Sequence, residues 1–115
     1  MRVELSSGSW VEVRDRLQGG DRTAVNTLVR ITVKQGDDRI EQEVGGDLTD
    51  RMHDTLLANI ITGWSYPEPI PSQGGGVDAV AALDLDDYLE LHAKTDALLK
   101  RVTAKLPNRE TPAAG

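Results

Sequence analysis

The segment Leu48–Pro71 constrains the fold more than any other part of this chain. Its first part has the 3.6-residue spacing of an amphipathic helix, with apolar residues over about half of the circumference. These residues are Met52, Leu56, Leu57, Ile60, Ile61 and Trp64. The following residues, Tyr66–Pro71, have proline at every second position, which forbids a helix and favours an extended strap. A helix with so wide an apolar face, joined to a stiff strap, predicts a surface that packs against another element or a partner.

Composition narrows the class of protein. A chain of 115 residues supports one small domain, which we place at residues 1–107, and without Phe its core must be mainly aliphatic. Because such a core is thin, burial in a homo-oligomer or a complex would stabilise it. The chain has no Cys, so disulfides and thiolate metal sites are excluded.

Charge and hydropathy exclude further classes. The net charge of −6 makes the chain a poor ligand for nucleic acid, whose phosphates require a positive field. No apolar run resembles a signal peptide, and none approaches the ~20 residues that cross a membrane. We therefore expect a soluble intracellular protein whose partners are proteins, and neither nucleic acid nor a membrane.

The N-terminal residues 2–14 have the pattern of a β-hairpin. Val3 and Leu5 lead into the turn-forming residues Ser6–Ser9, after which Trp10–Val13 resumes an extended, β-prone pattern. A lone hairpin is only marginally stable in water. We therefore expect this one to pack against helices or another subunit.

Two structures compete for the next segment. Asp21 is a suitable N-cap for a helix at about 21–34. The β-branched residues of 27–34 and the alternating pattern of 39–44 also fit a second hairpin. The sequence alone leaves helix and hairpin open for residues 27–44.

Two further helices are predicted at about 47–64 and 84–106. The first has Asp47 as its N-cap. The second has Asp84 as its N-cap, with acidic residues in its first turn and basic residues in its last turn, where they complement the helix dipole. Its apolar residues also cover about half of the helix surface. They are Leu85, Tyr88, Leu89, Leu91, Leu98, Leu99, Val102 and Leu106.

The remaining segments complete the predicted fold. Gly74–Gly76 lies between the two long helices, and we expect residues 72–80 to form a flexible linker. Residues 108–115 are small and polar, which is typical of a disordered tail. The predicted class is mainly α with a small N-terminal β-hairpin (α+β), with about three helices of which the last two are long and amphipathic.

No group of residues predicts catalysis. His53 and His92 lie on the apolar faces of their helices, which is typical of histidine at the edge of a packed or partner-facing surface. The acidic residues Asp84, Asp86 and Asp87 lack the central Gly and distal Glu of a calcium loop, and no Lys-Ser/Thr follows the glycine run as in a phosphate loop. We expect no enzymatic activity, no cofactor and no metal site.

The strap Pro67–Pro71 has two interpretations. One is a polyproline ligand for an aromatic groove on a partner. The other is structural: the prolines lay Tyr66 and Ile70 back over the exposed side of the central helix. We favour the structural interpretation, because the strap lies between two helices of one small domain.

Four segments, taken in order, carry a resemblance to a known family. They are Ser-Gly-Ser-Trp-Val-Glu-Val-Arg-Asp at 7–15, Leu-Leu-Ala-Asn-Ile-Ile-Thr-Gly-Trp-Ser-Tyr-Pro at 56–67, Pro-Ile-Pro-Ser at 69–72 and Leu-Asp-Leu-Asp-Asp-Tyr at 83–88. With these segments the chain resembles small proteins of tailed, siphovirus-type phages of actinobacteria that are described as tail assembly chaperones. The resemblance covers about Ser7–Leu106, and its marks are structural, without a catalytic signature.

The resemblance implies a non-enzymatic helper that acts in the cytoplasm of the bacterial host while a long phage tail is built. Proteins of this family bind the hydrophobic tape measure protein, keep it soluble and help to recruit tail tube subunits. Many are made in a short form and in a frameshifted long form. The residues from Asn108 onward would suit the short form.

The logic of a helix that packs into a groove gives the candidate protein-binding residues. They are Leu57, Ile60, Ile61, Trp64, Tyr66, Leu91, Leu98 and Val102. Each can instead belong to the domain's own core, and we favour the core for any single residue. The alternative function is a structural virion component, a head–tail connector or minor tail protein completed by neighbours in a ring. An antitoxin-like regulator is disfavoured, because no DNA-binding helix is recognisable.

Overall fold

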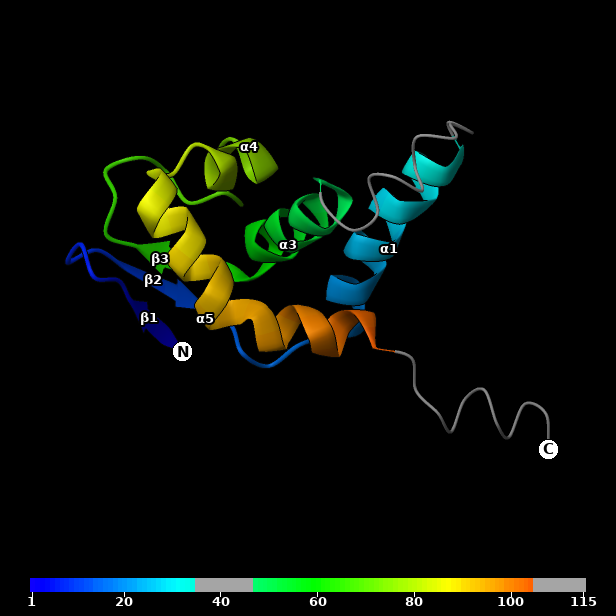
Figure 1. The fold of residues 1–115 in the computed structure, drawn as a ribbon, viewed down its shortest axis with the longest axis horizontal. Coiled ribbons are helices and arrows are strands. Elements are labelled where there is room, and N and C mark those ends of the chain that lie inside the picture. Colours follow the sequence, from blue (N-terminus) through cyan, green and yellow to red (C-terminus); the bar gives the residue numbers. More distant parts are fainter. Residues whose placement is uncertain (35–46, 105–115) are drawn as a thin grey trace.

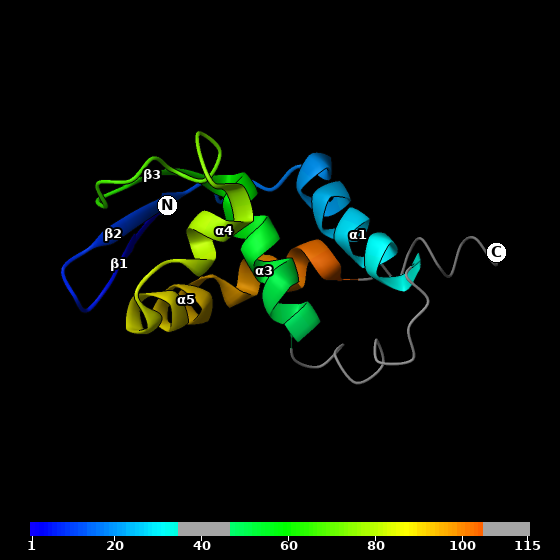
Figure 2. The ribbon, with the colours of Figure 1, turned by 90° about the horizontal axis from the view of Figure 1, so that it is seen from above.

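The computed structural model describes residues 1–34 and 47–104. These residues form a three-stranded antiparallel sheet and four helices, so the predicted α+β class with its N-terminal hairpin is confirmed. The sheet lies at one end of the molecule and α1 (Gly19–Lys34) at the other, with α3 (Asp47–Ile60) between them (Figure 1, Figure 2). Helix α3 packs against α1, α4 (Gly76–Ala81) and α5 (Leu85–Thr103), which makes it the centre of the fold.

The hairpin pairs β1 (Arg2–Glu4) with β2 (Trp10–Val13), with Val3 opposite Val11. Its turn is closed by hydrogen bonds from the Leu5 amide to the Ser9 carbonyl and from the Gly8 amide to the Leu5 carbonyl. Gly8 has a φ of 97°, a left-handed conformation that glycine adopts without steric cost. The predicted hairpin at residues 2–14 is confirmed, and its alternate residues Val3, Val11 and Val13 are buried.

The prediction of a helix at 47–64 is wrong at its C-terminal end. Helix α3 ends at Ile60, and β3 (Ile61–Trp64) pairs with β2 as the third strand. The β-branched Ile61 and Thr62 suit a strand, and Gly63 is a poor helix former. The Arg14 amide donates to the Ile60 carbonyl, so pairing with the sheet begins where the helix ends.

Helix α1 confirms the helical alternative for residues 27–34, and the hairpin alternative is wrong because its first strand is helical. The remainder of that prediction, residues 35–44, lies outside the described residues. Helix α1 begins at Gly19, two residues before the predicted N-cap Asp21. The side chain of Asp47, the predicted N-cap of α3, also lies outside the described part of the chain.

The prediction of a flexible linker at 72–80 is wrong, because tight turns lead directly into α4. The Ile70 carbonyl accepts from the amides of Gln73 and Gly74, and the Pro71 carbonyl accepts from the Gly76 amide. Val80 is fully buried and anchors α4 to the core. The glycines therefore serve turn geometry, since Gly75 and Gly76 have φ values of 85° and 54°.

Helix α5 has its predicted N-cap, because the Asp84 side chain accepts from the Asp86 amide at 3.2 Å. It ends at Thr103, earlier than the predicted 106; residues 105–106 and the predicted tail at 108–115 lie outside the described residues. The helix changes direction about halfway along (Figure 1). There the Thr95 hydroxyl donates to the Leu91 carbonyl one turn earlier, a bond that often bends helices.

One hydrophobic core joins the sheet to the helices. It is aliphatic, as the composition predicts, and the aromatic residues Trp64, Tyr66 and Tyr88 pack at its margin. Its buried members are Val3, Leu5, Val11, Val13, Val25, Leu56, Leu57, Ile60, Ile61, Val80, Leu91, Leu98, Leu99 and Val102.

Candidate functional site

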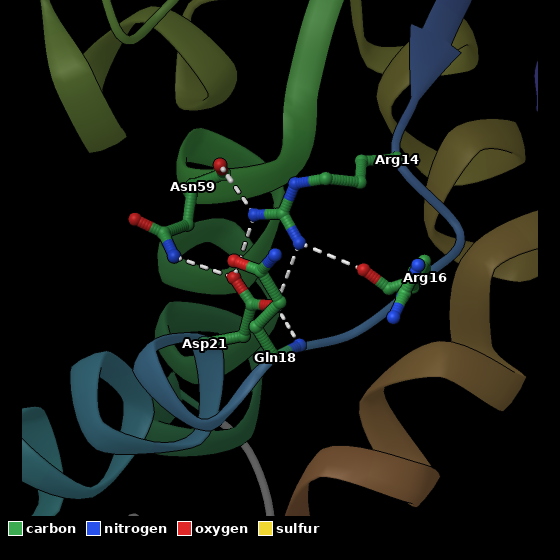
Figure 3. A network of polar contacts seen from close by, with 5 residues as sticks. All are labelled: Arg14, Arg16, Gln18, Asp21 and Asn59. Atoms are coloured by element: carbon green, nitrogen blue, oxygen red, sulfur yellow. Dashed lines mark hydrogen bonds and ion pairs between the residues drawn. The ribbon is translucent and has the colours of Figure 1, made fainter.

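The first polar cluster, which we call the clamp, is formed by Arg14, Asp21 and Asn59 (Figure 3). The Arg14 guanidinium donates to both Asp21 carboxylate oxygens at 2.9 Å, and the Asn59 amide donates to the same carboxylate at 2.6 Å. Asp21 also accepts from the Gln18 amide at 2.7 Å. Asp21 is therefore the third residue of α1, which binds back to the residue before the helix, and not the N-cap itself.

The charged groups of the clamp are paired with each other within the protein. The hydrogen bonds from Arg14 lower the pKa of Asp21 to about 2, although burial alone would raise it. Asp21 is 1% exposed, and its charge is compensated by a bidentate arginine. The clamp therefore fixes the loop after β2 to α1 and to the C-terminal turn of α3, which is a structural role.

The second polar cluster, which we call the imidazole cluster, lies between α3 and α5. His53 and His92 stack with ring centroids 4.0 Å apart. The His92 Nε2 atom lies 2.7 Å from one oxygen of Asp54, whose other oxygen accepts from the Tyr88 hydroxyl at 3.0 Å. An imidazole and an acid therefore converge here, the combination that acid–base catalysis would require.

The imidazole cluster is largely shielded from solvent. His53 is buried, and its Nε2 lies 2.8 Å from the Thr95 hydroxyl. Because that hydroxyl donates its only proton to Leu91, it accepts from His53, which fixes the tautomer. Burial, and then the neighbouring His92, lower the pKa of His53 to about 4. Neither histidine lines the main groove described next, which agrees with histidine packed in a helix interface.

The main groove, with a volume of 490 Å³, lies where the strap, α4 and the start of α5 meet. That volume is within the range of about 300–1,000 Å³ usual for ligand sites. Eight of its ten lining residues are apolar, aromatic or glycine, and the other two are acidic. They are Trp64, Tyr66, Glu68, Pro69, Gly74, Gly75, Ala79, Ala82, Leu83 and Asp84.

Hydrogen bonds hold the aromatic wall of the groove in place. The Trp64 indole N–H donates to the Glu68 carbonyl at 2.8 Å, and the Tyr66 hydroxyl donates to the buried Asp87 carboxylate at 2.7 Å. The two rings meet edge to face with centroids 5.2 Å apart. Burial, and then the bond to Asp87, raise the pKa of Tyr66, so its hydroxyl stays a donor. The wall is preformed rather than dependent on a ligand.

The strap combines parts of both interpretations. Tyr66 and Ile70 pack against the core, as the structural interpretation predicts. The Tyr66 hydroxyl reaches α5, however, and not the central helix. Glu68 and Pro69 face the groove, so the strap forms a wall of a site on this chain.

The structure divides the predicted protein-binding residues into two groups. Six are at most 7% exposed and belong to the core of this chain: Leu57, Ile60, Ile61, Leu91, Leu98 and Val102. Only Trp64 and Tyr66 line the groove. Three further groove residues were missed: Ala79 lies within the predicted linker at 72–80, and Ala82 and Leu83 lie between that linker and the helix predicted from 84. The sequence signal that could have found them is the combination of alternate prolines with the glycine run, which is typical of tight turns that reverse the chain.

Comparison with known protein families, curated proteins and solved structures gave no match. Within residues 1–34 and 47–104, no group of three or more histidine or acidic side chains is arranged to hold a metal ion. None of the helices in the described ranges is long and apolar enough to cross a membrane. The groove, with its aromatic wall held by hydrogen bonds, is the candidate site.

Proposed function

We propose that this chain is a non-enzymatic tail assembly chaperone of a tailed phage, which binds the tape measure protein and assists tail tube assembly in the host cytoplasm. The observation that carries the proposal is the groove. Its walls come from three of the segments on which the resemblance rests, at 56–67, 69–72 and 83–88. These segments supply Trp64, Tyr66, Pro69, Leu83 and Asp84.

The groove suits a protein client better than a reaction. Its surface is mainly apolar and has a preformed aromatic wall, which are features of pockets that anchor a partner's side chains. The imidazoles lie outside it, bound to Asp54 and Thr95. An acidic body that covers apolar segments of a client keeps both proteins in solution.

Ala82 and Ala81 provide a matched test. Both are exposed, but only Ala82 lines the groove. We expect Ala82→Arg to fill the groove and to lower the soluble yield and pull-down of a co-expressed tape measure protein, whereas Ala81→Arg adds the same side chain outside it. Circular dichroism checks that both variants fold. Polar substitution of Ile61 tests folding instead, because Ile61 is in the core.

Three results would overturn the proposal. One is a tape measure protein whose solubility does not depend on the chain. Another is an equal effect of Ala82→Arg and Ala81→Arg. The third is the chain in stoichiometric amount in purified particles, which would favour the alternative of a structural virion component.

A further inference from the structure

The charge of this chain is unevenly distributed along the sequence. Residues 52–93 contain seven acidic side chains and no lysine or arginine, whereas the rest of the chain has twelve acidic and thirteen basic side chains. The whole excess negative charge therefore belongs to a segment that runs from α3 through β3, the groove and α4 to the first half of α5. Such an asymmetry creates a directed field and not merely an acidic protein.

Several acids of this segment face solvent without a compensating cation. Three of the seven are bound by His92, Tyr66 and Lys94. The other four are exposed and form no ion pair within residues 1–34 and 47–104. They are Glu68, Asp78, Asp84 and Asp86. Two of these, Glu68 and Asp84, line the groove, whose ten lining residues include no basic side chain.

Exposed apolar side chains gather in the same part of the chain. Leu85 is 66% exposed and Leu89 is 55% exposed; they are one turn apart on α5 and share a face. Val77 on α4 is 37% exposed. The sequence predicted Leu85 and Leu89 as part of an apolar face, but the core does not cover them. The groove thus opens among elements that combine uncovered apolar groups with unpaired carboxylates.

We propose that the occupant of the groove is a basic, amphipathic segment of a partner protein, with an apolar side chain seated against Trp64 and flanking lysines or arginines that meet Glu68 and Asp84. This inference rests on the proposed function and names the chemistry of its client. Charge complementarity carries it, because a cation in the groove finds two carboxylates that have no cation partner within the described residues, beside two aromatic rings. Acidic segments are repelled by these carboxylates, and purely polar segments bury no apolar surface in the groove.

Three labelled synthetic peptides test the proposal by fluorescence anisotropy with the full chain. The first is an amphipathic peptide of Leu, Lys and Arg, the second has Glu in place of the basic residues, and the third has Ser in place of Leu. We expect the first to bind at least about tenfold more tightly than either of the others, and less tightly at high salt. Equal binding of the acidic or the serine peptide would overturn the proposal.

Two double variants locate the effect. Glu68→Gln with Asp84→Asn removes the groove charges, while Asn keeps the N-cap of α5. Glu4→Gln with Asp15→Asn removes two exposed charges from β1 and the loop after β2, away from the groove. We expect the groove variant to bind the basic peptide about tenfold more weakly, and the control within about twofold of the wild type. Similar losses in both variants would contradict the assignment.

The same variants separate this inference from the proposed function. If the tape measure protein binds the wild type and the variant Glu68→Gln with Asp84→Asn equally well, the proposed chaperone function is retained and the proposal of a basic occupant is wrong. If the basic peptide binds in the groove but the tape measure protein does not, the chaperone proposal fails alone. Sedimentation tests a second copy as the occupant: self-association that Ala82→Arg abolishes would overturn the inference.

Discussion

The clamp lies beside the start of β3 and the groove beside its end, and their charged groups have different environments. In the clamp, Asp21 is buried and receives hydrogen bonds from Arg14, Asn59 and the Gln18 amide. In the groove, Glu68 and Asp84 are exposed beside apolar walls, with no cation in the described part of the chain to compensate them. The imidazole cluster resembles the clamp, because its buried polar groups are also paired.

The difference shows how polar groups divide between fold and function in a small domain. Buried charges that are fully hydrogen-bonded fix the relative positions of elements and are not available to a ligand. Exposed charges beside a preformed apolar surface contribute little to folding and are available to a partner. Substitutions in the clamp should therefore change stability, and substitutions of the groove charges should change binding.

The largest effect on stability is expected for Asp21→Ala. It leaves the Arg14 guanidinium without its bidentate partner and the Gln18 amide without an acceptor. We expect the free energy of unfolding to fall by about 3–5 kcal/mol, measured by urea denaturation. Asp15→Ala, at an exposed position of the loop after β2, should change the free energy of unfolding by less than about 0.5 kcal/mol. A loss below about 1 kcal/mol at Asp21 would show that the clamp does not hold the fold.

The next effect concerns pH and the imidazole cluster. Burial lowers the pKa of folded His53 to about 4 from its ordinary 6.5, so the unfolded chain takes up a proton at higher pH than the folded one. The contribution of neutral His53 to the free energy of unfolding is fully present above pH 6.5. As the pH falls toward 4, about 3 kcal/mol of this contribution is lost. His53→Gln should flatten this part of the pH profile of urea midpoints. An unchanged profile would contradict a buried, neutral His53.

A smaller effect compares two tyrosine hydroxyls that each donate to a buried carboxylate, Tyr66 to Asp87 and Tyr88 to Asp54. Tyr66→Phe leaves buried Asp87 without its donor, whereas Tyr88→Phe leaves Asp54 still paired with His92. We expect the Tyr66 substitution to cost about 1–3 kcal/mol and the Tyr88 substitution less. The Tyr66 variant should also bind the tape measure protein more weakly, because the groove wall is no longer fixed. Thermal unfolding and pull-down measure the two effects, and the reverse order would sink the comparison.

The smallest effect is expected for Gly75→Ala, where the strap turns into α4. Gly75 has a φ of 85°, and an added Cβ would lie 3.0 Å from the Ala79 Cβ. We expect a loss of about 1–2 kcal/mol from the left-handed conformation and this contact. Gly76 has a φ of 54°, but a Cβ added there would have no atom within 4 Å, so Gly76→Ala should cost less stability. Denaturation midpoints of the two variants decide whether the close contact matters.

Local signals made the hairpin and α5 predictable. Gly8 lies where the turn needs a left-handed residue, and Asp84 caps α5 as its position before an apolar pattern indicates. β3 was missed because Ile61 and Trp64 continue the spacing of α3, while its pairing with β2 depends on residues about fifty positions away. A periodic pattern cannot register such a tertiary contact.

The candidate site was less predictable than the fold for the same reason. Trp64 and Tyr66 stood out by residue type, but Ala79 and Ala82 carry no chemical signal of their own. They become part of a site only because the turns at residues 70–76 place α4 against the aromatic wall. The clamp was also hidden, since Arg14 and Asn59 are 45 positions apart in the sequence and are brought together only by the fold, through Asp21 and through a hydrogen bond from Arg14 to the Asn59 carbonyl.

Nuclear magnetic resonance of the ¹⁵N-labelled chain, titrated with a basic, apolar fragment of the tape measure protein, tests the central claim most directly. The Trp64 indole N–H lies in the groove wall, whereas the Trp10 indole is on another strand and provides an internal reference. We predict saturable shifts of the Trp64 indole and of the Gly74, Gly75 and Ala82 amides, with the clamp unchanged. Shifts confined to other surfaces, or none at concentrations where the tape measure protein is kept soluble, would contradict the account.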